Sequence, residues 1–343
     1  MRNDVLRKMT NLGVAAGFLV ASAYVAEAID YSTYVQLNTN PSLTGGYPPA
    51  ANWTPSTDMA TSPNECYYVP ANRTIYTKNG SGPSAGSWSC AEFAIAGTYT
   101  VNVSSSRAYA PVFTGRLALL SGATVTGNGA YSTVSADAIE VRATADSPAR
   151  VTYNYSNEKN TDYCLQFAAP LISADSSAVI RFERVSQFDG YDIARGFRLT
   201  KGCADYLGTI VVAGARTWLR DAGSSNFDIG GTLKLTEGGN LHLNTQSPTF
   251  GSLVVESGST VELVGGKTIT VNGLLSIADG AIVKVDKLAS TDFAYDNGSN
   301  VPPEIPVISV CGAENAAKVD RDGLHFTISE TGWAKAMWGK LYG

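Results

Sequence analysis

Aliphatic and polar positions alternate in a repeated template along the second half of the chain. Residues 231–243, 251–263 and 273–285 each carry glycine or an aliphatic residue at offsets 0, 2, 4, 7, 10 and 12. Two alternating aliphatic pairs on either side of a glycine turn predict two short strands per repeat of about 20 residues, each with one apolar face toward a shared interior. Such a repeat is typical of one turn of a β-solenoid.

Degraded copies of this template lie earlier in the chain. Residues 115–125 match five of the six offsets. Another copy begins at Gly208, with Trp218 at the fifth position of the template. Between residues 131 and 207 the alternation persists in shorter pieces, which we interpret as turns of the same coil with longer loops. Because one turn cannot bury its own apolar face, we expect the turns to stack about 4.8 Å apart and both ends to be capped.

The sequence therefore predicts an all-β fold, a single-stranded parallel β-helix (β-solenoid) with N-terminal and C-terminal caps. The solenoid is expected over residues 115–285. Residues 29–114, rich in aromatic residues and proline, are predicted to form an N-terminal cap and the first turns, and residues 286–343 a C-terminal cap. No clean linker interrupts residues 100–290, which favours one elongated domain.

Residues 1–28 have the pattern of a secretory signal peptide. A basic start is followed by an apolar run over residues 12–25 and by the small-x-small triplet at residues 26–28. The alternative is an uncleaved N-terminal anchor, although the run is shorter than the roughly 20 apolar residues that a membrane span needs. We expect a mature chain without a membrane span that is secreted, extracellular or on the cell surface.

Charge and cysteine content add two expectations. Charged residues make up only 16% of the chain and the net charge is −5, which argues against a nucleic-acid partner. The chain has five cysteines, so at least one stays unpaired within it. Cys66 and Cys90 flank a loop rich in glycine and serine and are the preferred disulfide, while the pairing of Cys164, Cys203 and Cys311 stays open.

Candidate catalytic chemistry is sparse. The triplet 160–162 resembles the first of four motifs of polygalacturonase-like β-helix hydrolases, which use paired carboxylates, but the other three motifs are absent. A lyase would need a base next to a uronate carboxylate, together with acidic ligands for Ca²⁺. Acidic and basic residues collect in one place, residues 189–201, which equally fits a solvated turn with local ion pairs. The candidate residues for an enzyme are Asp162, Asp189, Asp192, Arg195, Arg198 and Lys201.

Neither a metal nor a cofactor is expected. The chain has two histidines, His242 and His325, and no neighbouring histidine or cysteine would complete a transition-metal site. His242 alternates with two leucines, so we expect it to point outward on the surface. Among the aromatic residues, Trp53, Trp88 and Tyr67 would form a stacking platform for sugar rings if exposed, or plug the apolar end of the solenoid if buried.

The glycine-leucine repeats, the segment 113–119 and the predicted signal peptide together resemble secreted right-handed β-helix proteins of the autotransporter-passenger type. These include proteins with autotransporter-associated β-strand repeats. The resemblance covers residues 67–285 and implies secretion or surface display, often with adhesion. It implies no catalytic residues.

Three functions follow as hypotheses. The first is a non-enzymatic extracellular or cell-surface scaffold with an adhesin-like role, whose partner would be a polysaccharide or a cell-surface glycan. The second is a polysaccharide-active β-helix enzyme, a lyase or a glycoside hydrolase. The third is a glycan-binding module. An enzyme should gather carboxylates, or a carboxylate and a base, in one groove on a sheet face, whereas a scaffold should show dispersed serine, threonine and asparagine rows. The oligomeric state is open.

Overall fold

The computed structural model describes residues 29–40, 42–44, 50–56, 64–78, 87–102, 112–129, 132–154, 164–173, 175–184, 196–221, 227–264 and 269–286, and the strands 308–310, 319–321, 324–328 and 334–336. The contacts divide the chain into two units, Met1–Thr33 and Tyr34–Gly343. The first unit contains the short 3-10 helix η1 (Tyr31–Thr33). Every other described element belongs to the second unit, and the predicted signal peptide lies outside the described residues.

Three large sheets form most of the second unit. The strands of each are named here in the order in which they pair. Sheet A consists of β14 (Leu171–Ser173), β11 (Ala138–Val141), β8 (Val112–Leu119), β6 (Ser87–Ile95), β4 (Cys66–Val69), β1 (Val35–Leu37) and β3 (Trp53–Thr54). Sheet B consists of β2 (Ser42–Thr44), β5 (Thr74–Lys78), β7 (Thr98–Asn102), β9 (Thr124–Gly127), β12 (Ala149–Tyr153), β15 (Val179–Arg184), β17 (Thr209–Ala213), β19 (Ile229–Thr236), β21 (Thr249–Val255), β23 (Ile269–Val271) and β26 (Ile308–Val310), with β24 (Leu275–Ile277) also on β21. Sheet C consists of β10 (Thr133–Val134), β13 (Leu165–Phe167), β16 (Phe197–Leu199), β18 (Trp218–Arg220), β20 (Asn240–Leu243), β22 (Thr260–Val264) and β25 (Ile282–Asp286).

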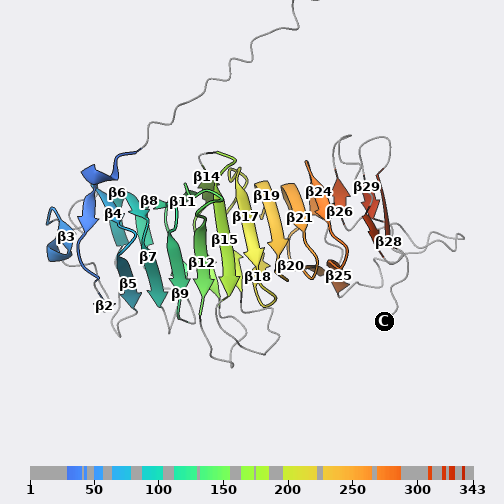
Figure 1. Cartoon of the computed structure of the whole chain (residues 1–343), viewed down its shortest axis with the longest axis horizontal. Helices are drawn as coiled ribbons and strands as arrows, with labels where there is room; N and C mark the ends of the chain where they lie inside the picture. The colour runs from blue at the N-terminus through green and yellow to red at the C-terminus, as the bar shows by residue number, and fades with distance from the viewer. Residues whose placement is uncertain are drawn as a thin grey trace, which may run out of the picture. The chain divides into compact units, whose positions relative to one another are not determined.

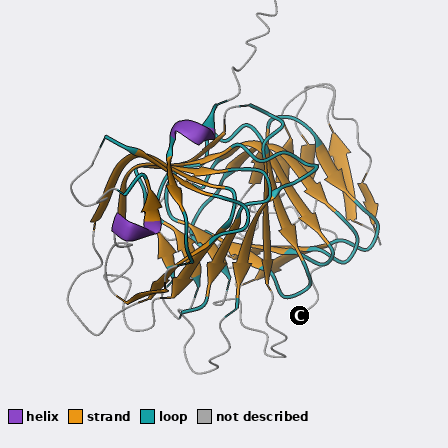
Figure 2. Cartoon of the chain, turned by 60° about the vertical axis from the view of Figure 1, so that its left-hand side comes forward, coloured by secondary structure: helices purple, strands orange, loops and turns teal. Residues whose placement is uncertain are grey.

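These sheets confirm the predicted β-solenoid, which has about 7 turns. Strands of successive turns lie side by side in chain order, as the colour gradient from blue to orange shows (Figure 1). Pairing is parallel throughout the three sheets except between β1 and β3. Nearly all described structure is strand or loop (Figure 2), and the two helices, η1 and η2 (Ala50–Asn52), are single short turns. Neither described helix is long or apolar enough to cross a membrane.

The predicted caps stay predictions. At the N-terminal side, β3 adds to sheet A in the antiparallel direction. Most of residues 286–343 lies outside the described residues, and what is described there beyond β26 is a small antiparallel sheet of β27 (Val319–Arg321), β28 (Leu324–Ile328) and β29 (Ala334–Ala336).

The core is built from columns of inward side chains that repeat once per turn. One column in sheet B passes through eight strands, with each side chain opposite the next: Tyr99, Val125, Val151, Phe182, Val212, Leu235, Val255 and Ile277. The first seven are at most 1% exposed. Inward alternation therefore lets each turn bury the apolar face of its neighbour, as expected for a coil whose single turns cannot fold alone.

The number of strands per turn differs from the prediction. Where the sequence predicts two strands in each repeat, the middle turns have three, for example β8, β9 and β10. The early copy of the template is also displaced by one sheet, because Leu117 lies in sheet A and Val125 in sheet B, whereas Leu233 lies in sheet B and Leu241 in sheet C. The template describes two strands with alternate inward side chains on either side of a glycine turn. Any two consecutive sheets of the coil have this pattern, so the template does not indicate which two they are.

The predicted position of Trp218 is wrong by one residue. Leu219, fully buried, lies opposite Leu241, and Trp218 lies opposite Asn240. The turn that begins at Gly214 contains more residues before the next inward position than the turn at Gly238 does, so counting offsets from the first glycine assigns the core position to the wrong side chain.

Glycines near the start of β19 and β21 allow close stacking of the turns. A Cβ atom added at Gly231 would lie 2.1 Å from the carbonyl oxygen of Gly208, and one added at Gly251 would lie 2.0 Å from that of Gly230. Both contacts are with backbone atoms, which cannot move without shifting a neighbouring turn.

We therefore expect Gly231→Ala to lower the free energy of unfolding by about 1–3 kcal/mol, the usual effect of overpacking. Gly202→Ala is the matched control, since a Cβ atom there would meet nothing within 4 Å and the backbone conformation suits a side chain. Chemical denaturation followed by circular dichroism measures both variants. Equal stability of the two would contradict the close stacking.

Candidate functional site

Most of the predicted catalytic residues lie outside the described residues. These are Asp162, in the connection 155–163, and Asp189, Asp192 and Arg195, in the connection 185–195. Arg198 is partly exposed on β16, and Lys201 is exposed just after that strand. The described residues therefore place one predicted candidate, Arg198, on the outer face of a sheet.

Arg198 belongs to an outward column of polar residues on sheet C. In register, Gln166, Arg198, Arg220, His242 and Glu262 lie opposite one another on five successive strands. His242 Nε2 lies 3.8 Å from Glu262 Oε1, and the two side chains are only 10% and 4% exposed. The ring of Trp218 lies edge-on to His242 with centroids 6.3 Å apart.

The surface position predicted for His242 is thus wrong in one respect. Its neighbours Leu241 and Leu243 are fully buried in the solenoid interior, so His242 does point outward as predicted. It is nevertheless only 8% exposed. Alternation identifies which face of a strand a residue occupies, but not whether that face is open to solvent.

Two of the three predicted sugar-stacking rings are buried. Trp53 is 1% exposed and Tyr67 is fully buried, with ring centroids 5.0 Å apart at 68° to each other. Trp53 also packs edge-on against Phe93, at 6.4 Å. A buried ring cannot stack on a sugar, so the predicted sugar-stacking role is wrong for Trp53 and Tyr67. Both side chains instead fill the interior of the first turns. The side chain of Trp88, on β6, lies outside the described residues.

Cys66 and Cys90 lie on the neighbouring strands β4 and β6 and are free thiols in this structure. Burial raises the pKa of Cys90 to about 12, with further contributions from the nearby Cys66 and Glu92. Cys203 is also a free thiol, and both Cys203 and Cys164 are fully buried. The disulfide between Cys66 and Cys90 stays a prediction.

A charged cluster on the outer face of sheet A joins three strands and was not predicted from the sequence. Arg142, directly after β11, donates from Nη1 and Nη2 to the two oxygens of Glu92 on β6, at 2.8 and 2.7 Å. The same Nη2 donates to Glu140 Oε2 at 2.6 Å. Arg116 donates to Glu140 at 2.9 Å, and the Tyr34 hydroxyl donates to Glu92 at 2.9 Å. We call these five residues the arginine clamp.

The two glutamates of the arginine clamp are spaced like a catalytic carboxylate pair, but the neighbouring arginines lower the pKa of Glu140, the opposite of what a general acid needs. Both glutamates contact one nitrogen atom, so their carboxyl groups are as close as the roughly 5 Å found in retaining glycosidases. A general acid needs a raised pKa. At Glu140, burial favours the neutral form, but the hydrogen bonds and charges of Arg142 and Arg116 outweigh it and hold the pKa below its usual value. The geometry fits a structural clamp rather than an acid-base pair.

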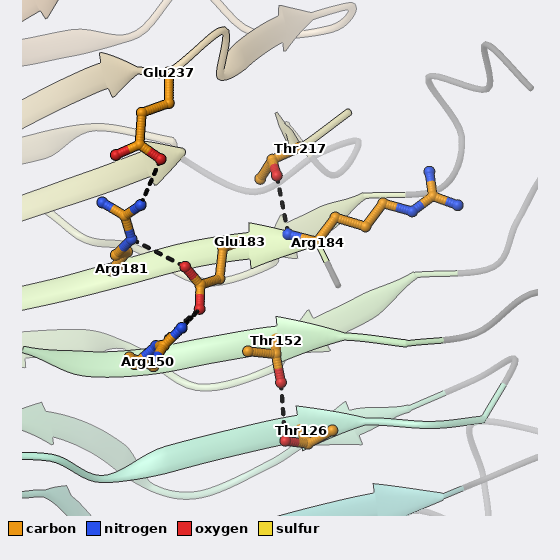
Figure 3. Close-up of polar contacts among 8 residues, drawn as sticks. All are labelled: Thr126, Arg150, Thr152, Arg181, Glu183, Arg184, Thr217 and Glu237. Atoms are coloured by element: carbon orange, nitrogen blue, oxygen red, sulfur yellow. Dashed lines mark hydrogen bonds and ion pairs between the residues drawn. The ribbon is translucent and has the colours of Figure 1, made fainter. Parts of the chain in front are cut away.

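A second network runs along the outer face of sheet B (Figure 3). Glu183 on β15 accepts from Arg150 on β12 at 2.8 Å and from Arg181 at 3.0 Å. Arg181 also donates to Glu237 at 2.7 Å, across the strand β17 that lies between them. Although burial opposes it, hydrogen bonds from the two arginines keep the pKa of Glu183 below its usual value. Further along, Glu256 pairs with Lys234 at 2.7 Å and accepts from Thr236.

Threonines fill the same face nearer the N-terminus. Thr126 and Thr152 share a hydrogen bond of 2.9 Å between neighbouring turns (Figure 3). At the end of β15, the backbone N–H of Arg184 donates to the Thr217 hydroxyl at 2.9 Å.

Among the described residues, no group of three histidine, cysteine, aspartate or glutamate side chains is arranged to hold a metal ion.

Sequence reasoning missed both networks because their partners lie far apart in the chain. Arg142 and Glu92 are 50 residues apart, and Arg181 and Glu237 are 56 apart. The sequence signal for such a network is a charged residue between two inward aliphatic residues, as in Ile139-Glu140-Val141, but this pattern does not indicate which residue is its partner.

Comparison of the chain with protein-family models, with curated proteins and with solved structures finds no match.

Proposed function

We propose that this protein is a non-enzymatic extracellular or cell-surface β-solenoid scaffold with an adhesin-like role. One observation carries the proposal: the glutamates on two outer faces are engaged by arginine or lysine residues of the same sheet face, within one turn or from other turns. They are Glu92 and Glu140 beside sheet A, and Glu183, Glu237 and Glu256 beside sheet B. A catalytic carboxylate has to be available to substrate, whereas these carboxylates join turns to one another.

A polysaccharide-active enzyme is the second candidate, and one arrangement favours it. On sheet C, His242 and Glu262 place a base and a carboxylate 3.8 Å apart, in the same column as Arg198 and Arg220. A lyase needs a base and a cation near a uronate carboxylate. The deep burial of His242 and Glu262 weighs against access by a polymer.

A turnover assay separates the two functions. The purified full chain is incubated with a panel of neutral and acidic polysaccharides, with and without Ca²⁺, and scored for new reducing ends and unsaturated uronates. We expect no turnover, together with retention of the protein on at least one immobilised polysaccharide or cell-wall preparation.

Two sets of variants make the result decisive. Product release that disappears in His242→Gln or Glu262→Gln would establish an enzyme centred on sheet C. Release that disappears only in Asp189→Asn and Asp192→Asn would establish one built on the predicted polar segment. Either result would overturn the scaffold proposal.

A further inference from the structure

Two rows of side chains cross the outer face of sheet B on its first strands. The first row contains Thr74, Thr98 and Thr124, and the second contains Tyr76, Thr100, Thr126 and Thr152, each opposite the next in register. The residues between the rows, Ile75, Tyr99 and Val125, are fully buried, so the rows face outward. We call these seven residues the threonine rows.

The threonine rows form a regular and ordered surface. Neighbouring turns are about 4.8 Å apart, and alternate residues along a strand about 6.7 Å apart. Branching at Cβ restricts the side-chain rotamers of threonine, which keeps the hydroxyl groups in place. Two hydrogen bonds add order: Thr126 pairs with Thr152 at 2.9 Å, and Asn102 Nδ2 donates to the Tyr76 hydroxyl at 2.6 Å.

Charge distinguishes this surface from the other described outer faces. Five of its residues, Thr74, Tyr76, Thr98, Thr124 and Thr126, are partly exposed, while Thr100 and Thr152 are each 7% exposed. On sheet C, by contrast, the outward column contains the charged residues Arg198, Arg220 and Glu262, and on sheet A the arginine clamp occupies the face. The seven residues themselves carry no charge. Lys78 ends β5, and Arg150 lies directly opposite Thr124 on the next strand, where it forms an ion pair with Glu183.

We propose that the threonine rows bind a neutral polysaccharide whose chain runs along the solenoid axis. Hydroxyl groups that both donate and accept suit the hydroxyls of a sugar, and the partly exposed Tyr76 offers a ring for stacking. Because the hydroxyls recur once per turn, successive sugars meet equivalent groups on successive strands. The absence of charge on the rows favours a neutral chain over a polyanion. This inference rests on the proposed adhesin-like function and names its contact face and partner class.

Binding to insoluble polysaccharides tests the proposal. The full chain is mixed with cellulose or chitin, and the bound fraction is measured at low and high salt. We expect retention that salt does not weaken, since no ion pairs are involved. Thr98→Glu combined with Thr124→Glu should lower the affinity at least about tenfold, equivalent to about 1.4 kcal/mol. Thr260→Glu, at a partly exposed threonine on sheet C, is the matched control and should bind normally.

Thr124→Val provides a milder variant, since it keeps the shape and removes only the hydroxyl group. It should weaken binding without changing the circular dichroism spectrum. Normal binding by both row variants, or equal loss in Thr260→Glu, would overturn the assignment to the threonine rows while leaving the adhesin-like role standing. Binding to polygalacturonate alone would contradict a neutral polysaccharide as the partner. Inhibition of ice growth without retention on any polysaccharide would also contradict it. Retention on no polysaccharide or cell-wall preparation would remove the proposed function itself.

Discussion

Arg142→Met is expected to lower the free energy of unfolding by about 3–5 kcal/mol, the usual cost of removing one partner from a buried ion pair. Arg142 is 14% exposed and bridges Glu92 and Glu140, which are 11% and 10% exposed. Without the guanidinium, two carboxylates on strands that flank β8 lose their shared partner and repel each other. Thermal or urea unfolding, followed by circular dichroism, measures the loss.

Arg116→Met is the matched control. Arg116 contacts only one of the same glutamates through a side chain that is 48% exposed, so its removal should cost no more than about 1 kcal/mol. Equal losses in Arg142→Met and Arg116→Met would contradict the central place of Arg142 in the clamp.

The pH dependence gives an independent signature of the clamp. In the wild type, the pKa of Glu140 is lowered from its ordinary value of 4.5, so this carboxylate stabilises the fold above that pH and loses its contribution as the pH falls through the lowered value. In Arg142→Met, Glu140 keeps only the half-exposed Arg116 as a partner, so burial should raise the pKa of this group above its value in the wild type. Acidification from pH 7 to about 5 should then restore part of the lost stability, as Glu140 takes up a proton. A purely steric effect of the substitution would not change with pH.

Phe182→Ala is expected to cost about 3–5 kcal/mol, because it opens a cavity in the middle of the solenoid. Phe182 is 1% exposed and stands in the sheet B column between Val151 and Val212. Its ring also packs edge-on against Phe167 and Phe197 on sheet C, with centroids 5.7 and 5.1 Å away. The substitution therefore loosens contacts between two turns and between two sheets.

Leu207→Ala is the control for apolar side-chain loss. Leu207 is 51% exposed, so its truncation should change the stability by no more than about 0.5 kcal/mol. Because a solenoid is held together turn by turn, Phe182→Ala should also increase amide hydrogen exchange first in β12, β15 and β17, the strands next to the cavity. Uniform exchange along the whole chain would contradict a local loss of contact.

Most inward-facing core residues could be predicted from the sequence. Leu233, Leu235 and Leu241 follow the glycine template and stack on Leu253, Val255 and Val261 as expected. The interval of about 20 residues is the length of one turn in that region, so residues at the same template offset become neighbours. The prediction failed where turn lengths vary, as at Trp218, because one extra residue in a turn moves the side chains of the next strand to the opposite face.

The candidate site was only slightly predictable. Asp162, Asp189, Asp192 and Arg195 were chosen because they are close in sequence, and their placement lies outside the described residues. The outer-face networks that the structure does describe join residues up to 58 positions apart. Sequence proximity indicates contacts within one turn, whereas the functional surface of a solenoid forms between turns.

By itself the sequence determined the fold class and the identity of most inward residues, since strict alternation leaves each strand residue only two faces and burial selects the apolar one. The tertiary structure decided which outward residues meet. Loop lengths set which turn lies next to which, and that register brings Arg142 to Glu92 and aligns Thr98 with Thr124. It also decided that Trp53 and Tyr67 lie inside rather than outside, because composition shows that a ring is present but only packing determines whether water reaches it.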